Sequence, residues 1–337
     1  MNRKRLSNIV KYVLFLAIGV TIFYFVYKGQ DPAGIWEGIR QFKIEWILIS
    51  YVFSIFSHII RALRWRMMIM PLGYTPSRIN SFLAILIMYL ANYVFPRLGE
   101  VSRCGVLTKY EKVPFTEQLG TVISERAVDV ILLILLFLIV LLAQLGVVSG
   151  FIENTRIKMG FDSGLITSWE FWTIISAAIL VMSAIILVYR RKIFRSRIAV
   201  RLRELISRFF QGLLSVRNVR KPVLFLGYSI GIYACYFFMT YSVFLGYEPA
   251  RELGAMGAFL VLAMGSVGMI IPVQGGIGTY HFFVVETVVV LGMARPEGQM
   301  LALVLHGATT IFMIFIGLLA LVALPLVNRK ARPKHLE

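Results

Sequence analysis

The stretch VDVILLILLFLIVLLAQL, residues 128–145, decides the fold, because a helix of this composition is long enough to cross a lipid bilayer. A membrane-spanning helix needs roughly 17–25 mostly apolar residues. Residues 171–189 and 301–327 form similar runs. None of these runs alternates apolar and polar residues, as the strands of a transmembrane barrel do. The sequence therefore predicts an all-α polytopic integral membrane protein.

The composition excludes a soluble enzyme. Of the 337 residues, 58% are hydrophobic and 15% are charged, whereas soluble domains are roughly 25% charged. The mean hydropathy is +0.79. The longest polar stretch, residues 190–221, is shorter than the roughly 40 residues that a chain usually needs to fold alone. We therefore expect a single membrane domain over residues 1–337, embedded over about 11–327, and no catalytic domain.

Basic residues are clustered along the chain, and the clusters predict its orientation. The net charge of +18 is concentrated in residues 1–11, 61–78, 190–221 and the tail, 328–337. Basic loops stay in the cytoplasm, so we expect both termini there, in a bacterial inner membrane, and no nucleic-acid partner. Residues 190–221 hold eleven Lys or Arg against Glu204 alone, with apolar residues at helical spacing. This pattern predicts a basic cytoplasmic loop with an amphipathic interfacial helix.

The number of apolar segments between two basic clusters predicts a re-entrant hairpin. Three segments, about 79–95, 122–146 and 171–189, separate 61–78 from 190–221, and three crossings would put one basic cluster outside. The first runs into Pro96 and Gly99, where the chain can break and turn back. A second break, residues 272–278, separates two short apolar pieces, 255–271 and 279–293, which predict a hairpin entered from the other side.

Two topologies follow from these segments. The first has two oppositely entering hairpins, the earlier over residues 79–110, and six full spans, at about 11–28, 45–61, 122–146, 171–189, 223–245 and 300–327. Paired interrupted segments of this kind are typical of transporters with a central site. The alternative is eight full spans with glycine at packing contacts.

Charged residues gather around the first break. They are Arg97, Glu100 and Arg103 at the break, and Glu125, Arg126 and Asp129 at the start of the next span. Glu125 and Asp129 are four residues apart and share one helix face, so they need cationic partners. Arg97 and Arg103 are the economical choice. Two interpretations stay open: a static ion-pair clamp, or an arginine left free to bind an anionic headgroup.

The second break offers backbone groups for binding. Gly275, Gly276 and Gly278 lack a Cβ and let amides approach a ligand, and a helix starting at Thr279 presents an N-terminus that favours anions. Three histidines at membrane depth, His58, His281 and His306, are packing residues or members of a proton relay. Cys104 and Cys235 have no neighbour at ligand spacing, so we expect no metal and no cofactor.

Three motifs in this order resemble one family. PRLGEVSR (96–103), ERAVD (125–129) and PVQGGIGTY (272–280), with Arg61 and Arg64 before them, resemble the transmembrane region of lysylphosphatidylglycerol synthases and its stand-alone, flippase-like relatives. The resemblance covers about residues 10–327 and implies a membrane region that moves a modified anionic lipid between leaflets. Gln274 stands where a second proline is usual and His281 where an acidic residue is frequent. The sequence ends at Glu337, so we expect no synthase activity.

The sequence therefore favours a flippase or lipid-linked transporter that moves a phospholipid or modified anionic lipid. The expected transport residues are Arg61, Arg64, Arg97, Glu100, Arg103, Glu125, Arg126, Asp129, Gln274, Gly275, Gly276, Gly278, Tyr280 and His281. The expected partners are membrane lipids with anionic headgroups, and a homo-oligomer stays open. The alternatives are an integral-membrane transferase with Glu125 or Asp129 as base, although no DxD-like metal pair is visible, and a non-catalytic scaffold.

Overall fold

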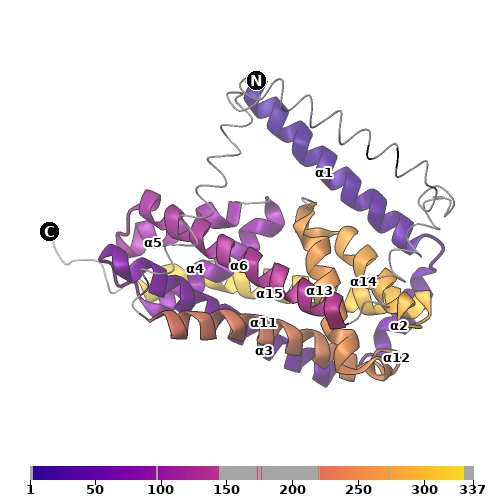
Figure 1. Cartoon of the computed structure of the whole chain (residues 1–337). Coiled ribbons are helices and arrows are strands. Elements are labelled where there is room, and N and C mark those ends of the chain that lie inside the picture. Colours follow the sequence, from indigo (N-terminus) through magenta and orange to yellow (C-terminus); the bar gives the residue numbers. More distant parts are fainter. Residues whose placement is uncertain are drawn as a thin grey trace.

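The computed structural model describes residues 3–95, 98–143, 173, 176, 219, 221–271 and 273–329, and every regular element in them is a helix (Figure 1). The predicted all-α class is confirmed. In chain order the helices are α1 (Arg3–Tyr27), α2 (Pro32–Arg40), α3 (Ile44–Ile69), η1 (Met70–Leu72), α4 (Arg78–Val94), α5 (Leu98–Glu111), α6 (Phe115–Ala143), α11 (Pro222–Leu245), α12 (Glu248–Glu252), α13 (Gly254–Ile270), η3 (Gln274–Gly276), α14 (Thr279–Val290) and α15 (Arg295–Val327).

Three helices in the described part of the chain are long and apolar enough to cross a membrane. They cover Ile44–Leu72, Pro222–Leu245 and Arg295–Val327. Two shorter apolar helices cover Leu14–Tyr27 and Gly254–Ile270. The predicted span at 171–189 and almost all of the predicted basic loop at 190–221 lie outside the described residues, as does most of the tail. The number of full spans therefore stays a prediction.

The predicted end of the second span at residue 61 is wrong. Helix α3 continues to Ile69, so Arg61 and Arg64 lie inside a helix and not in a basic loop. Their exposed fractions are 4% and 0%. The physical reason is that two carboxylates on α6 pair with both arginines. The two arginines are therefore buried in ion pairs and do not contribute to the charge of the surface. The other two arginines of this predicted loop, Arg66 and Arg78, lie in the last turn of α3 and at the start of α4, as a loop between these helices requires.

Helices α4 and α5 form the first predicted hairpin, and they pack against each other. Helix α4 ends at Val94, two residues before Pro96, because proline disfavours helical geometry in the residue before it. Gly99 approaches α4 so closely that a Cβ would collide with the Met88 carbonyl oxygen and the Asn92 side chain. The Gly99 N–H donates to Asn92 Oδ1 at 2.8 Å, which satisfies an amide in the first turn of α5.

Helices α13 and α14 form the second hairpin, closed by η3. Gly268 of α13 lies against α14, where a Cβ would come within 2.9 Å of Thr279 O and Tyr280 Cα. Gly275, Gly276 and Gly278 adopt φ values of 60°, 73° and 83°, which glycine reaches without steric cost. The turn from α13 into α14 therefore depends on these residues.

The two hairpins enter from opposite ends of the molecule and their tips meet. Gln274 Nε2 donates to the Tyr93 carbonyl at 3.0 Å, which joins the second tip to the first. Helix α4 starts beside the end of α15, where Asn80 and Asn328 bond to each other at 3.0 and 2.9 Å. Helix α13 starts at the other end, just after α11 and α12. Figure 1 shows α4 and α5 on the left of the molecule and α13 and α14 on its right.

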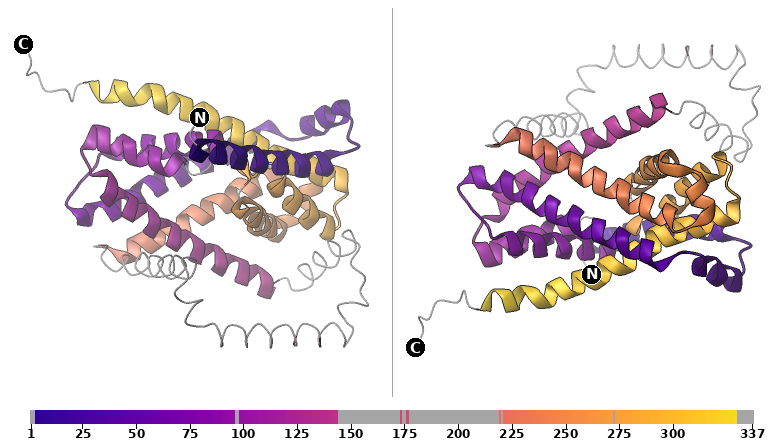
Figure 2. Two further views of the ribbon diagram at one scale, coloured as in Figure 1. Left: turned by 90° about the horizontal axis from the view of Figure 1, so that it is seen from above. Right: turned by 90° about the horizontal axis from the view of Figure 1, so that it is seen from below.

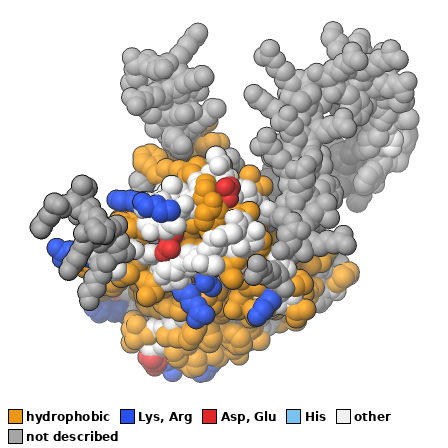
Figure 3. All heavy atoms as spheres, turned by 90° about the vertical axis from the view of Figure 1, so that its left-hand side faces the viewer, with side chains coloured by type: hydrophobic (Ala, Val, Ile, Leu, Met, Phe, Trp, Pro, Cys, Tyr) orange, Lys and Arg blue, Asp and Glu red, His pale blue; other side chains and the backbone are white. Residues whose placement is uncertain are grey.

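The two ends differ in charge. We call "basic end" the one formed by the end of α3 with η1, the start of α4, the α5–α6 turn, the start of α11 and the end of α15. It carries Arg66, Arg78, Lys109, Lys112, Lys221 and Arg329 against Glu111 and Glu117. The opposite end is mixed: Lys28, Arg40, Lys43, Arg251 and Arg295 stand beside Asp31, Glu37, Glu45, Glu248, Glu252 and Glu297. Figure 3 looks onto the basic end, where blue side chains dot a mostly apolar surface.

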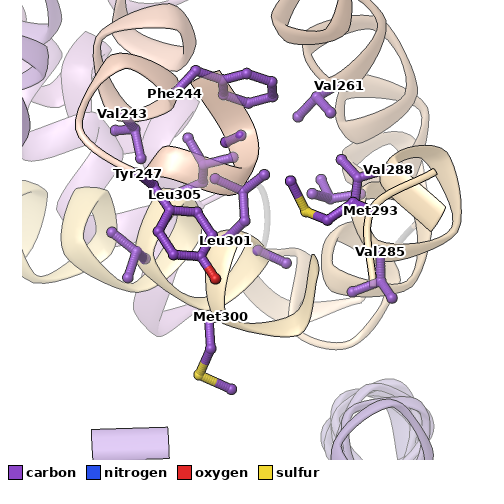
Figure 4. Close-up of a cluster of buried hydrophobic side chains, with 14 of the residues drawn as sticks. Val243, Phe244, Tyr247, Val261, Val285, Val288, Met293, Met300, Leu301 and Leu305 are labelled. Atoms are coloured by element: carbon purple, nitrogen blue, oxygen red, sulfur yellow. The ribbon is translucent and has the colours of Figure 1, made fainter. Parts of the chain in front are cut away.

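Packed cores hold each end together. At the opposite end, α11, α13, α14 and α15 interdigitate around fully buried residues such as Phe244, Val288 and Leu301 (Figure 4). At the basic end, α3, α4, α5 and α6 pack around Trp65 and Met88. Helices α3 and α11 pack side by side along one face, seen from below in Figure 2. These cores fix the long helices between which the charged residues lie.

Candidate functional site

Two arginines of α3 face two carboxylates of α6. Arg61 and Arg64 are three residues apart and share one helix face, as do Glu125 and Asp129, which are four apart. Arg61 Nη1 lies 3.0 Å from both Glu125 Oε1 and Asp129 Oδ2. Arg64 Nη2 lies 3.0 Å from Glu125 Oε1 and 2.6 Å from Asp129 Oδ1. Each carboxylate is therefore held by both arginines, in charge-assisted bonds.

A third arginine brings the first hairpin into this network. Arg103 of α5 places Nη2 2.7 Å from Glu125 Oε2, and its guanidinium carbon lies 4.5 Å from the centre of the Trp65 ring. Arg103 has no exposed surface. Stacking on an aromatic face supports a desolvated guanidinium. Helices α3, α5 and α6 are therefore joined at one buried carboxylate.

Hydroxyl groups of α4 and α11 complete the network. Arg61 Nη2 donates to Tyr236 Oη at 3.0 Å, and Tyr236 and Tyr89 share a hydrogen bond of 3.3 Å. Tyr233 Oη donates to the Asp129 carbonyl at 2.9 Å, and Arg64 Nη1 donates to Ser229 Oγ at 3.2 Å. The sequence interpretation missed these residues. Tyr233 and Tyr236, polar groups three apart in an apolar helix, were the available signal.

One positive charge remains in excess among the described residues of the site. Arg61, Arg64, Arg103 and Arg126 face Glu100, Glu125 and Asp129. Arg126 is the loosely held member, because its nearest carboxylate oxygens are 3.5 Å away on Glu100 and 3.8 Å away on Asp129. Its side chain is 41% exposed, whereas Arg64 and Arg103 are fully buried.

A cavity of about 470 Å³ opens beside this network. Its polar part is formed by Arg61, Arg126 and Asp129 with Tyr89, Tyr233 and Tyr236. Its apolar side chains are Val130, Leu133, Met239, Val243, Leu262, Met269, Ile270, Leu305 and Met313, and further hydroxyl and histidine side chains complete the wall. A volume of this size is typical of small-molecule sites. The cavity is therefore amphipathic, with charge at one part of its wall and hydrocarbon at the other.

The second hairpin contributes Tyr280 to the cavity wall, together with His306 of α15 and His58 of α3. His306 Nε2 donates to the Gly275 carbonyl at 2.8 Å, and its ring lies 4.9 Å from that of His281. His58 Nε2 lies 3.0 Å from Met313 Sδ, and its ring packs on that of Tyr89. The structure thus pairs two of the three histidines, and the proton relay stays a hypothesis.

The predicted anion site at the start of α14 is not where the cavity lies. Helix α14 does begin at Thr279, but this end is buried against α1, where a Cβ on Gly278 would collide with the Gly19 carbonyl. Among the described residues that line the cavity, Tyr280 is the member of the predicted second-break set. The others in that set, which do not line it, are Gln274, Gly275, Gly276, Gly278 and His281.

The predicted ion-pair partners were partly right. Arg103 does pair with Glu125, whereas Arg97 lies outside the described residues. Arg61 and Arg64 provide the other partners of the two carboxylates. Among the described residues, no group of three or more His, Cys, Asp or Glu side chains is placed to hold a metal ion.

Comparison with known proteins agrees with the resemblance in the motifs. A UPF0104 membrane protein of Methanocaldococcus jannaschii is 28% identical over 179 residues, which are 52% of this chain and 48% of that protein. The chain therefore matches about half the length of this curated relative. No solved structure matches. The family described as the lysylphosphatidylglycerol synthase TM region matches residues 12–317. The chain is thus a membrane protein and belongs to the lysylphosphatidylglycerol synthase TM region family.

Proposed function

We propose that the protein is a lipid flippase that moves an anionic amphiphile across the bacterial inner membrane through the cavity between the hairpin tips. The observation that carries the proposal is the amphipathic wall of that cavity, which offers a loosely held arginine and hydrocarbon side by side. A headgroup needs polar partners on its way through the bilayer, and an acyl chain needs apolar ones. Interrupted helices that meet near a polar site are typical of transporters.

The lengths of the hairpin helices support re-entrant entry. Helices α4, α5, α13 and α14 have 17, 14, 17 and 12 residues. At 1.5 Å per residue these are roughly 18–26 Å long, less than the roughly 30 Å of a hydrocarbon core. We propose that they are hairpins and that the basic end faces the cytoplasm.

Filling the cavity with a larger side chain tests the proposed function. Thr309 lines the cavity, and Ile311, two residues on along α15, is 70% exposed. We expect Thr309→Trp to lower the translocation rate of a fluorescent anionic phospholipid in proteoliposomes at least about tenfold, because the indole fills the space that a headgroup needs. Ile311→Trp is the matched control, and its rate should equal that of the unaltered protein. Size-exclusion profiles and melting temperatures show that both variants are folded.

The fate of the lipid separates a flippase from a transferase. A flippase returns the lipid with unchanged mass, whereas a transferase returns a product. Glu125 and Asp129 are each engaged by two or more arginines, which leaves neither carboxylate placed as a base. Equal rates for protein-containing and protein-free liposomes would refute the flippase proposal, and a mass change would support the transferase.

A further inference from the structure

Arg126 lies in the first half of α6, beside the tip of the first hairpin. The helix has 29 residues and Arg126 is eleven residues after its start at Phe115. At 1.5 Å per residue this is about 16 Å along a helix of roughly 43 Å. Glu100, its partner at 3.5 Å, follows the tip of the first hairpin by a few residues. The arginine therefore sits at the level where the hairpin tips meet.

The cavity opens to the surface beside Arg126, between α6 and α13. Four residues both line the cavity and are substantially exposed: Arg126, Val130, Met269 and Ile270. Val130 is 46% exposed and Ile270 is 64% exposed. We call this opening the mouth. Three of the four residues, Val130, Met269 and Ile270, are apolar. The mouth is therefore suited to contact with acyl chains.

The guanidinium of Arg126 is incompletely paired at this mouth. Its two carboxylate contacts, 3.5 and 3.8 Å, are longer than charge-assisted hydrogen bonds of 2.7–2.9 Å. Its Nε is buried and has no hydrogen-bond partner among the described residues. An arginine inside a bilayer is costly unless its charge is compensated. An incoming anion would compensate this charge.

The cavity is too small for a whole diacyl lipid. Its volume of about 470 Å³ is that of a site for a drug-sized ligand. A headgroup fits in it, whereas two long acyl chains do not. Since the mouth is apolar and opens sideways, the chains have a path that remains in hydrocarbon.

We infer that the substrate enters sideways through the mouth between α6 and α13, with its acyl chains left outside, and that Arg126 selects the anionic phosphate of its headgroup. This inference rests on the proposed flippase function and names its specificity residue. Arg61, Arg64 and Arg103 are tied to carboxylates and position the site. Among these four arginines, Arg126 is the one whose side chain is substantially exposed at the mouth, 41% against 5% or less for the others, so it is the one that an entering phosphate can reach.

Photo-crosslinking tests the inference without transport. The probes are phosphatidic acid and diacylglycerol with the same diazirine acyl chain, in vesicles of neutral phospholipid. We expect phosphatidic acid to label Val130, Met269 and Ile270, and Arg126→Gln to reduce that labelling about tenfold, the equivalent of 1.4 kcal/mol. Arg126→Lys should retain part of it, because charge remains but the fork is lost. Arg78→Gln, an arginine at the basic end, is the control and should change nothing.

Three results would overturn the inference. They are equal labelling by both probes, labelling that Arg126→Gln leaves intact, and labelling spread evenly over outward residues such as Ile311. Inorganic phosphate in excess should not compete, because the acyl chains anchor the ligand; full competition would make the site one for free phosphate. Failure of translocation by the unaltered protein would refute the flippase proposal, whereas the crosslinks would still report on lipid entry.

Narrowing the mouth provides a second test. We expect Val130→Trp to slow translocation and to lower crosslinking at Met269 several-fold, because the indole projects into the opening. Ile139→Trp is a matched control on the same helix, since Ile139 is 57% exposed and does not line the cavity. If Val130→Trp is folded and transports at the unaltered rate, lipid does not enter between α6 and α13.

Discussion

At the scale of single residues, Glu125 is the centre of the network, because three arginines from two helices contact one carboxylate with no exposed surface. Buried ion pairs repay their desolvation only when every partner is present. Removal of one partner therefore leaves a buried charge uncompensated. The stability of the protein should depend steeply on each of these side chains.

Arg103 and Glu125 should be energetically coupled. We expect Arg103→Met and Glu125→Gln each to lower the free energy of unfolding in mixed micelles by about 3 kcal/mol. The double variant should lose less than the sum by about 1–3 kcal/mol, because neither charge is then left alone. A double-mutant cycle measures this difference.

A second buried carboxylate provides the control for this cycle. Glu286 of α14 lies 2.7 Å from Arg295, in a separate ion pair. Arg103→Met combined with Glu286→Gln should be additive within about 0.5 kcal/mol. Additive losses in the Arg103 and Glu125 cycle as well would contradict the network.

The sequence was informative about some of these pairs and silent about others. The spacing of Glu125 and Asp129 predicted that both need cations, and Arg103 was a correct choice. Arg61 was assigned to a basic loop, because an arginine at the end of an apolar run is equally suited to a surface and to a buried pair. Only the packing of α3 on α6, more than sixty residues apart in sequence, decides between them.

At the scale of elements, the two hairpins depend on different devices. The first turns where Pro96 prevents continuation of α4, and the second turns on three glycines with positive φ. Both turns were predicted from the sequence, since proline and glycine act locally. That the tips touch through Gln274 and the Tyr93 carbonyl was not predictable, because no local pattern encodes a contact between residues 181 positions apart.

Glycine substitutions in the tip of the second hairpin should distinguish two effects on stability: collision of an added Cβ with α1, and the strain of a positive φ. Gly278→Ala should lower stability by about 1–3 kcal/mol, because its Cβ would collide with the Gly19 carbonyl of α1 and its φ is 83°. Gly275→Asn should cost less than about 1 kcal/mol, because asparagine tolerates the left-handed region and the nearest atom, on the Tyr93 ring, is 3.5 Å away. Thermal unfolding in detergent measures both. Equal losses would show that α1 does not pack on this turn.

At the scale of the whole molecule, the ends carry the information on orientation. The basic end gathers cations from four separated parts of the chain, while the opposite end is balanced. The sequence predicted this asymmetry because charge is read directly from composition. It could not assign Arg61 and Arg64 correctly, yet the asymmetry persists without them.

Cysteine accessibility should place the two ends on opposite sides of the membrane. In a protein whose Cys104 and Cys235 are replaced by alanine, Lys112→Cys should react only with reagents that reach the cytoplasm. Glu248→Cys should react with an impermeant maleimide added outside. Reaction of both from outside would make the first hairpin a full span, and exchange of the two patterns would reverse the orientation.

The meeting of the hairpin tips has an electrical consequence in the proposed re-entrant topology. An anion bound beside Arg126 then lies between the two faces of the membrane, so a complete transit is divided into two charge movements. The full membrane potential acts on a single charge with about 2.3 kcal/mol per 100 mV. The two movements share this energy between them. A membrane voltage that favours one direction of travel would thus speed both movements in that direction and slow both in the reverse direction.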